Sequence, residues 1–303
     1  MRLAGGVDEW SELAAAGWRG QPVKVTPLGG GMVGRVRLVH WDDGSRCVVK
    51  TVPDDGSGNP ADMLEVEAEG LAALAATETV SVPRVLHVSQ GVLVLEPLGA
   101  RLDGGGFWAT LGRDLAALHT TAVGERFGWH HDGWLGRKRQ DNTWNDDGHD
   151  FVAQQRLLRY LPEPRLRTAL GPADRRALER LCSRLPELLP ASPPVLTHGD
   201  LWSGNVLSTA DGSPALVDPA ACYSIAEMDL SMLWCARRPA GVERCFAAYQ
   251  EIAPLASGWR QRMRILYLRE LLCTLAHAGD VEGAGDAVRE ILTPFRAAGS
   301  PTT

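Results

Sequence analysis

Near its middle the chain reads His198-Gly199-Asp200-Leu201-Trp202-Ser203-Gly204-Asn205, and Asp218 follows shortly afterwards. Asp200 and Asn205 stand five residues apart, a spacing typical of phosphoryl-transfer sites in which the Asp orients the accepting hydroxyl and the Asn holds a metal ion. A polar loop that caps a hairpin by chance is the alternative interpretation. The full set of residues favours phosphoryl transfer, with Asp200 as the catalytic residue.

The residues between Asn205 and Asp218 predict a β-hairpin. Two short apolar runs, Val206-Leu207 and Ala215-Leu216-Val217, flank a turn at Asp211-Gly212, and a Gly-containing turn between apolar runs is a hairpin signal. The hairpin brings Asp218 back beside Asn205, so that both side chains can supply oxygen ligands to one Mg²⁺. Transfer of a γ-phosphoryl group needs charge neutralisation more than covalent help, which explains why an amide, a carboxylate and Mg²⁺ converge.

Length and composition limit the class of protein. With 303 residues the chain is long enough for two lobes, each with its own core. Apolar residues make up 45% of it and charged residues 22%, which is ordinary for a globular protein. The net charge of −6 argues against a broad surface for nucleic acid or an anionic membrane. A small-molecule substrate is therefore expected, and the oligomeric state stays open.

The cysteines and the start of the chain bear on its location. The six cysteines form no Cys-x-x-Cys pair and no small-domain disulfide spacing, so they are expected to be reduced and mostly buried. The first residues lack the apolar core of a signal peptide. No apolar stretch reaches the roughly 18 residues that predict a membrane span. Together these features predict a cytoplasmic enzyme.

Residues 23–52 predict antiparallel strands around a glycine-rich turn. The turn contains Gly29, Gly30 and Gly31, and glycines allow backbone N–H groups to approach phosphate oxygens. Alone, three adjacent glycines fit a flexible hairpin tip equally well. Lys50 ends the returning strand, where its ammonium could meet the α and β phosphates of a nucleotide. The combination favours nucleotide binding by these four residues.

A helix is predicted next, because Asn59-Pro60-Ala61-Asp62 combines a cap residue, Pro at the first helical position and an acid in the first turn. Glu67 lies on its apolar face, whereas Glu65 and Glu69 point elsewhere. A carboxylate that faces a core needs a cation, since burying it unpaired costs several kcal/mol. We expect an ion pair between Glu67 and Lys50; the alternative is a Glu at the edge of the stripe that reaches water.

The segment Val92 to Gly99 begins as a buried strand and is broken by Pro97. This break predicts the hinge between the lobes, with backbone groups of Glu96 and Leu98 facing the adenine edge of the nucleotide.

From Phe107 onward helical periodicity dominates, with helices expected at about 150–160, at about 172–189 and onward to about Arg296. The chain is therefore expected to be α+β and bilobal. A small N-terminal lobe with an antiparallel sheet spans residues 1–98 and binds the nucleotide. A larger, mostly helical lobe spans residues 99–303 and carries the catalytic and acceptor-binding residues.

Three polar residues are expected to support the site without taking part in the chemistry. His119 lies on an apolar helix face and is expected to be packed. His198, two residues before Asp200, is expected to brace the loop through backbone hydrogen bonds. Asp229 could accept N–H bonds from the catalytic loop.

His130 and His131 beside Asp132 suggest a metal site at first sight. The cysteines and the remaining histidines show no matching zinc spacing. The sequence therefore favours an ordinary polar loop at this position.

With these residues in hand, the chain resembles the fructosamine kinase (ketosamine kinase) family, within the protein-kinase-like and aminoglycoside-phosphotransferase-like fold. The stretch from His198 to Asn205 carries the resemblance, because Leu-Trp-Ser-Gly between the Asp and the Asn is similar to this family in particular. Asp218-Pro219-Ala220 resembles the family's metal-binding Asp-Pro-Ala. The resemblance covers nearly the whole chain, from the glycine turn to about residue 290.

The resemblance extends to the loop that begins Phe127-Gly128-Trp129-His130. Because this loop is expected to border the acceptor, His130 and Asp132 are candidate substrate-binding residues. The chain departs from the family's pattern in this region, with Gly133 where Asn is common, Asp141 where Pro is common and Gly148 where Trp is common.

The resemblance implies an ATP-dependent kinase with Mg²⁺ that phosphorylates a sugar hydroxyl, typically O3, of a ketosamine such as fructosamine or ribulosamine. Breakdown of such products frees the amine, so that a role in deglycation is implied. Asp200 would accept the hydroxyl proton, and Asn205 and Asp218 would hold the metal. Trp202 would either stack on the sugar or shape the loop as a core residue, and the sequence does not separate these two.

Two alternatives stay open at this point. One is a small-molecule kinase of the same fold that acts on an aminoglycoside, a choline-like amine or another hydroxylated metabolite. Acidic residues could recognise a cationic amine in either case (Asp141, Asp146, Asp147 and Asp150). The other is a nucleotide-binding pseudoenzyme, which the filled catalytic positions argue against.

Overall fold

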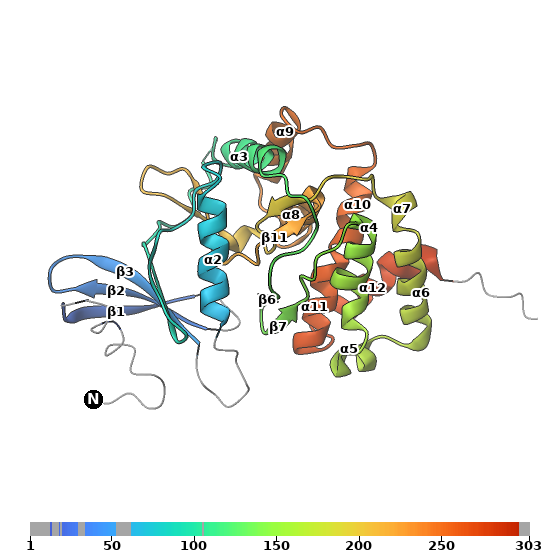
Figure 1. Cartoon of the computed structure of the whole chain (residues 1–303), viewed down its shortest axis with the longest axis horizontal. Coiled ribbons are helices and arrows are strands. Elements are labelled where there is room, and N and C mark those ends of the chain that lie inside the picture. Colours follow the sequence, from blue (N-terminus) through green and yellow to red (C-terminus); the bar gives the residue numbers. More distant parts are fainter. Residues whose placement is uncertain are drawn as a thin grey trace, which may run out of the picture.

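The computed structural model describes residues 13, 18, 20–29, 34–52, 62–104 and 106–296. Figure 1 shows an antiparallel sheet at one end of the molecule, a larger and mostly helical part at the other, and helix α2 between them. The predicted α+β class with a small sheet and a larger helical part is confirmed. Gly30, Gly31 and the expected helix start at residues 59–61 lie outside the described residues.

The sheet contains five strands in the order β1-β2-β3-β5-β4, all antiparallel to their neighbours. The central strand β3 pairs with β2 and β5, so that Lys50 lies opposite Val36 on one side and Leu93 on the other. The strands are β1 (Pro22–Leu28), β2 (Arg35–Trp41), β3 (Arg46–Thr51), β4 (Val85–Val88) and β5 (Val92–Leu95). The expected antiparallel unit at residues 23–52 is therefore confirmed.

Alternation along β3 decides which of its side chains face α2. Cys47 and Val49 are buried in a cluster on one face of the sheet. Successive side chains of a strand point to opposite faces, so Val48 and Lys50 face the other side, where α2 (Met63–Ala75) packs. This alternation places the ammonium of Lys50 against α2.

The helical part follows β5. Its helices are α3 (Phe107–Thr121), α4 (Gly148–Asp150), α5 (Pro164–Ala169), α6 (Pro172–Ser183), α7 (Leu185–Leu188), α8 (Ala226–Cys235), α9 (Val242–Gln250), α10 (Trp259–Leu266), α11 (Leu268–Ala278) and α12 (Ala284–Leu292). A π-helix spans Phe151–Leu157, and 3₁₀ turns span Leu158–Tyr160, Ser203–Asn205 and Thr293–Phe295. In the described part of the chain, every helix is too short or too polar to cross a bilayer.

Short strands in this part hold the loops of the site. β8 (Val195–Thr197) pairs with β11 (Cys222–Ser224), β9 (Val206–Ser208) pairs with β10 (Pro214–Leu216), and β6 (Gly133–Leu135) pairs with β7 (Lys138–Gln140). The β9–β10 pair is the hairpin that the sequence predicts between Asn205 and Asp218, and it is confirmed.

Two expected helices differ in detail from the observed ones. The helix expected at about 150–160 is a π-helix followed by a 3₁₀ turn. The helix expected at about 172–189 is broken at Arg184, between α6 and α7. Pro186 explains this break, because it lacks the N–H that would bond to the carbonyl four residues earlier.

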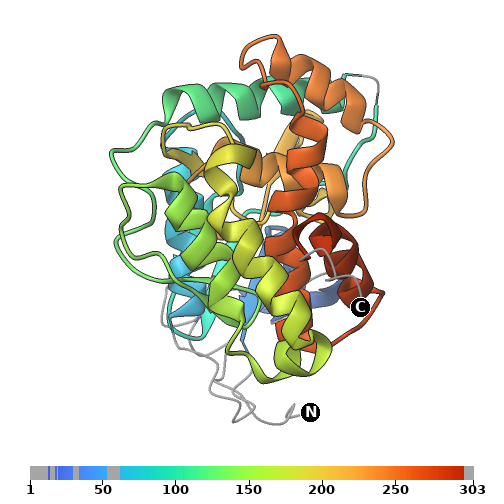
Figure 2. The ribbon, with the colours of Figure 1, turned by 90° about the vertical axis from the view of Figure 1, so that its right-hand side faces the viewer.

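Figure 2 shows the helical part from its own side, with α3 and α9 lying together along its upper edge. The two helices approach closely at Gly112 of α3. A Cβ added there would lie 2.1 Å from the carbonyl oxygen of Cys245, so the position needs glycine for steric reasons and not for its dihedral freedom.

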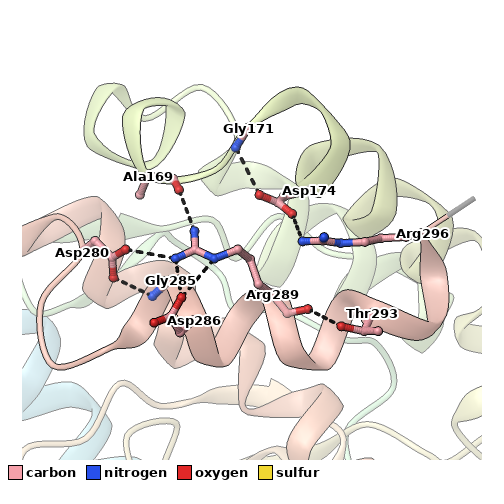
Figure 3. Close-up of polar contacts among 9 residues, drawn as sticks. All are labelled: Ala169, Gly171, Asp174, Asp280, Gly285, Asp286, Arg289, Thr293 and Arg296. Atoms are coloured by element: carbon pink, nitrogen blue, oxygen red, sulfur yellow. Dashed lines mark hydrogen bonds and ion pairs between the residues drawn. The ribbon is translucent and has the colours of Figure 1, made fainter. Parts of the chain in front are cut away.

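Hydrogen bonds and an ion pair hold the last helix and the residues after it against the rest of the helical part (Figure 3). Arg289 of α12 donates to Asp286 at 2.7 Å and to the carbonyl oxygen of Ala169, after α5, at 3.2 Å. Arg296 donates to the buried Asp174 of α6 at 2.5 Å, and Asp174 accepts from the N–H of Gly171 at 3.2 Å. These contacts hold the end of the described chain against α5 and α6.

We predict that Gly112→Ala lowers the free energy of unfolding by about 2 kcal/mol, because overpacking outweighs the gain in helix propensity. The melting temperature should fall by about 4–8 °C, measured by thermal denaturation. Gly104→Ala is the matched control, since no heavy atom lies within 4 Å of a Cβ added there. An equal effect of both substitutions would contradict the close approach of α3 and α9.

Candidate active site

The catalytic loop follows β8 and is closed by a hydrogen bond between its two key residues. Asn205 Nδ2 donates to the Asp200 carbonyl oxygen at 2.8 Å and to Asp200 Oδ2 at 3.1 Å. The 3₁₀ turn at Ser203–Asn205 bends the chain so that these residues meet. The amide nitrogen of Asn205 is thereby used for the loop, and its oxygen is turned away from Asp200.

The β9–β10 hairpin returns Asp218 to this loop. Val206 pairs with Leu216, and the N–H of Val217 donates to the carbonyl oxygen of Asn205 at 3.0 Å. Asp218 has a left-handed backbone with φ of 58°, a conformation that Asp tolerates better than most residues. The expected approach of Asn205 and Asp218 is therefore present in the backbone.

Lys50 joins three elements at the site. Its Nζ lies 2.6 Å from Glu67 Oε1 of α2 and also contacts Asp218 Oδ1. The predicted Lys50–Glu67 ion pair is confirmed. Burial alone would lower the pKa of Lys50, but the two carboxylates hold it above its ordinary value, so the ammonium stays charged. Burial raises the pKa of Glu67.

Helix α2 packs directly on the loop after Asp218. A Cβ added to Gly70 of α2 would lie 3.2 Å from Pro219 Cγ and from Ala221 Cβ. The small residue lets the helix approach this loop, and the approach brings Glu67 within reach of Lys50.

Asp229 of α8 anchors the catalytic loop through hydrogen bonds to its backbone. Its carboxylate accepts the N–H of His198 at 2.7 Å and the N–H of Gly199 at 2.8 Å, and His119 lies 3.4 Å from Oδ2. Burial would raise the pKa of Asp229, but these hydrogen bonds and the nearby imidazoles hold it below its ordinary value. The expected support role of Asp229 and the packed position of His119 are confirmed.

His198 braces the same loop. Its Nδ1 accepts the N–H of Asp200 at 3.2 Å, and its Nε2 donates to the carbonyl oxygen of Val217 at 2.9 Å. Burial lowers the pKa of His198, which keeps the imidazole in the neutral form that these two contacts require. The expected bracing role is confirmed.

Gly199 is required by its backbone and by its surroundings. Its φ is +81°, and an added Cβ would lie 2.0 Å from the carbonyl oxygen of Ala220. The N–H of Ala220 donates back to the carbonyl oxygen of His198 at 2.8 Å. The two loops of the site therefore touch through backbone atoms.

Two charged residues of α11, Arg269 and Glu270, lie near Asp200, and no sequence pattern indicates them. Burial and the charge of Glu270 raise the pKa of Asp200 to about 8, while Arg269 opposes this rise. Arg269 donates to Gln140 Oε1 at 2.8 Å. In the described part of the chain Arg269 Nε, Arg269 Nη1 and Glu270 Oε2 are buried without a hydrogen-bond partner. No local motif marks these positions, because α11 reads as an ordinary amphipathic helix.

The environment of Trp202 is compatible both with stacking on the sugar and with shaping the loop. The indole is partly buried and covers Gly204, where an added Cβ would lie 2.1 Å from its ring. The guanidinium of Arg237 lies 5.5 Å from the ring centroid. Trp202 therefore shapes the loop, and part of its surface stays accessible.

The hinge and glycine-turn residues are placed as follows. The N–H of Glu96 donates to the Arg84 carbonyl oxygen at 3.0 Å, and its side chain pairs with Arg84 Nε at 2.9 Å. Leu98 is partly buried just before Gly99, whose N–H donates to the carbonyl oxygen of Ser208 at 2.7 Å. Gly29 follows β1, and Gly30 and Gly31 lie outside the described residues.

The candidate residues of the long loop contact α2. His130 Nε2 lies 2.8 Å from Oε1 of Glu69. From the sequence, Glu69 is expected only to point away from the apolar face of its helix. Asp132 Oδ1 accepts the N–H of Asn142 at 3.1 Å, so its carboxylate helps to fold the loop. Neither contact tests substrate binding by His130 and Asp132, which stays a prediction.

The acidic residues considered for amine recognition serve local structure. Asp147 caps α4 by accepting the N–H groups of His149 and Asp150, and Asp146 pairs with Arg126 at 2.6 Å. Asp141 accepts the N–H of Thr143 at 2.9 Å, and Asp150 accepts from Asn145 at 2.8 Å. This segment is therefore a weaker place for amine recognition than its composition indicates.

Comparison with known proteins gives consistent results. The model of the family described as Fructosamine kinase matches residues 11–293. A probable ketoamine kinase of Synechocystis is 37% identical over 210 residues, which cover 68% of this chain and 69% of that protein. A chloroplastic protein-ribulosamine 3-kinase of Arabidopsis thaliana is 31% identical over 274 residues, which cover 86% of this chain and 79% of that protein.

A solved structure agrees with these relatives. It comes from Thermobifida fusca and is named as a candidate fructosamine-3-kinase. It superposes with a TM-score of 0.80 at 34% identity, covering 90% of this chain and 95% of its own.

We predict that Asp229→Asn lowers the free energy of unfolding by about 3 kcal/mol at neutral pH, because an amide cannot accept all the buried N–H groups that the carboxylate accepts. The pKa of Asp229 lies below its ordinary value of 3.8, so its stabilisation is present above that pH and is lost as the pH falls through the folded-state pKa. The difference from wild type should therefore shrink below about pH 4, measured by denaturant unfolding. A difference that grows on acidification would contradict the assignment.

Proposed function

Because this chain belongs to the fructosamine kinase family, we propose that it transfers the γ-phosphoryl group of ATP to a sugar hydroxyl, O3, of a ketosamine. The enzyme is a phosphotransferase with a bilobal, protein-kinase-like fold, and kinases of this family use ATP. One observation supports the proposal above others: Lys50 reaches both Glu67 and Asp218 while Asp200 lies hydrogen-bonded to Asn205. These are the parts that phosphoryl transfer requires.

The donor atoms at the site fit Mg²⁺. Asn205 has its amide oxygen turned away from Asp200, and Asp218 supplies carboxylate oxygens from the end of the β9–β10 hairpin. Mg²⁺ prefers such oxygen ligands together with phosphate oxygens. When bound, the ion would neutralise charge on the transferring phosphoryl group. We assign Asn205 and Asp218 as its ligands.

The remaining residues take the following roles in the proposal. Asp200 orients the sugar hydroxyl and accepts its proton in the ionised form, and a pKa of about 8 in the nucleotide-free chain makes that carboxylate more basic than an ordinary Asp. Lys50, held by Glu67, contacts the α and β phosphates, and Gly29, Gly30 and Gly31 provide backbone N–H groups there. The backbone of the hinge at Glu96 and Leu98 meets the adenine, and Trp202 lies along the sugar.

Residues 1–98 act as the nucleotide-binding lobe and residues 99–303 as the acceptor-binding lobe in this proposal. The named activities of the Synechocystis and Arabidopsis relatives support a ketosamine as the acceptor. Release of the amine from the phosphorylated product would place the enzyme in deglycation. The enzyme needs ATP, and its cysteines are free, five of them buried. Both features are compatible with a cytoplasmic location.

Glu270 is assigned to the amine of the acceptor. A ketosamine carries a secondary amine, which is cationic at neutral pH when its substituent is an alkyl group. Glu270 Oε2 is buried without a hydrogen-bond partner in the described part of the chain, and its charge acts on Asp200. Burial raises the pKa of Glu270, and an ammonium placed against it would lower that pKa and stabilise the carboxylate. The carboxylate would thus recognise the amine while Asp200 meets the sugar.

We predict that Asp200→Ala lowers kcat by about 10³-fold or more while ATP still binds, because the base is removed and the nucleotide contacts stay. The measurement is Mg²⁺-dependent ADP release with fructosyl-, ribulosyl- and erythrulosyl-amines, next to aminoglycosides and choline. Asp211→Ala in the hairpin turn is the control and should keep normal turnover. Near-normal turnover of Asp200→Ala would exclude the assigned base. Activity of the wild type on aminoglycosides or choline alone would exclude the ketosamine.

We predict that Glu270→Gln raises KM about tenfold for a fructosyl-alkylamine, which is cationic, and leaves KM nearly unchanged for a fructosyl-aniline, which is neutral. The two acceptors share one sugar, so an indirect effect on Asp200 would change kcat for both alike. Glu290→Gln, an exposed carboxylate of α12, is the matched control. Equal changes in KM for both acceptors would remove Glu270 from amine recognition and leave the kinase activity standing.

A further inference from the structure

A carboxylate of α2 and two imidazoles of the long loop lie in contact with one another. Glu69, His130 and His131 each offer a ligand atom, and these atoms all lie within 4.8 Å of one another. Sequence reasoning set the histidine pair aside because it found no further cysteine or histidine at a suitable spacing. The third donor is a glutamate from α2, which only the fold brings to the pair.

The contacts within this cluster are short. His130 Nε2 lies 2.8 Å from Glu69 Oε1, and His131 Nε2 lies 2.8 Å from Glu69 Oε2. The two imidazole centroids are 4.4 Å apart. Zn²⁺ binds His nitrogen and carboxylate oxygen at about 2.0–2.2 Å, so that neighbouring ligand atoms of one ion lie about 3 Å apart. The nitrogens and oxygens are therefore already near the separations that a shared ion requires.

Both ring nitrogens of His131 face acceptors, so that a second proton or a metal ion has to lie between the ring and Glu69. Its Nδ1 lies 2.9 Å from the carbonyl oxygen of Asp132, which can only accept. Its Nε2 faces the carboxylate of Glu69, which also accepts. A neutral imidazole has a single N–H. Burial would lower the pKa of His131, but its hydrogen bonds to Glu69 and to the Asp132 carbonyl oxygen raise it, which favours the imidazolium with two N–H groups. A metal ion between Nε2 and the carboxylate can take the place of the second proton, with the remaining hydrogen on Nδ1.

The surroundings resemble the outer shell of metal sites. A ligating histidine usually donates its other N–H to a carbonyl or carboxylate, which fixes its tautomer. The carbonyl oxygen of Asp132 accepts such a bond from Nδ1 of His131. Trp129 Nε1 donates to Glu69 Oε1 at 2.9 Å and orients that carboxylate. The side chains of Glu69, His130 and His131 are 37%, 58% and 33% exposed, so that an ion can enter and the rings can adjust.

We propose that Glu69, His130 and His131 form a binding site for a divalent transition-metal ion of the Zn²⁺ class that ties α2 to the loop at residues 127–132. Two imidazoles favour such an ion over Mg²⁺ or Ca²⁺, which prefer oxygen ligands. Three protein ligands leave a coordination position for water. Glu69 lies two residues after Glu67 on α2, so the ion would steady the helix that holds Lys50.

The test is Zn²⁺ titration by calorimetry with the full chain, in excess Mg²⁺ to occupy the oxygen ligands of the phosphoryl-transfer site. One Zn²⁺ should bind, and each of Glu69→Gln, His130→Ala and His131→Ala should weaken Kd at least about tenfold. His87→Ala, Cys235→Ser and Asp218→Asn are the controls and should bind as the wild type does. Melting temperatures without metal would show that every variant is folded.

A second readout follows the proposed tie directly. Zn²⁺ should slow amide hydrogen exchange in α2 of the wild type and leave it unchanged in His131→Ala. The proposal is overturned if the wild type binds no Zn²⁺, or if Kd is the same in all three cluster variants. It is also overturned if binding is lost in Cys235→Ser or Asp218→Asn instead. None of these outcomes depends on which acceptor the enzyme phosphorylates.

Discussion

The ammonium of Lys50 is the group on which the site depends, because it is buried in contact with two carboxylates from separate elements. A buried cation is tolerated only when it is paired. Glu67 of α2 and Asp218 of the hairpin loop provide the pairing. Each partner therefore has its position restricted by the same charge. The sheet, α2 and the loop after β10 cannot move apart without exposing or unpairing that charge, so one electrostatic requirement sets the geometry of three segments.

A second buried charge gives the catalytic loop its shape. Asp229 accepts N–H groups from His198 and Gly199, and these bonds replace the hydration that the carboxylate loses on burial. The left-handed Gly199 allows the chain to turn over Asp229 and still pass within contact of Ala220. Asp200 then emerges from a backbone fixed on both sides. The position of the base thus rests on a residue that lies about thirty positions later in the sequence.

Local patterns in the sequence predicted the elements that they encode directly. The hairpin between Asn205 and Asp218 and the Lys50–Glu67 pair followed from a turn signal, strand alternation and helix periodicity. The break near Arg184 and the π-helix at Phe151–Leu157 were missed, because a proline's missing donor and a change of hydrogen-bond register leave the apolar periodicity almost unchanged. Roles of single residues such as Trp202 and Asp132 depend on an acceptor that no pattern specifies.

The residues that sequence reasoning missed share one physical property. Glu69 and Glu270 sit on helices whose apolar faces explain the surrounding sequence, so that each reads as a solvent-facing charge. Glu69 meets imidazoles of the loop after α3, and Glu270 lies near Asp200 of the catalytic loop, at distances along the sequence that periodicity cannot detect. A carboxylate becomes informative only when the fold shows what it faces. Glu69 faces two imidazoles, and Glu270 keeps a buried oxygen without a partner in the described part of the chain. Such charges are the places where a ligand has the most to contribute, since it supplies the pairing that the chain itself does not complete.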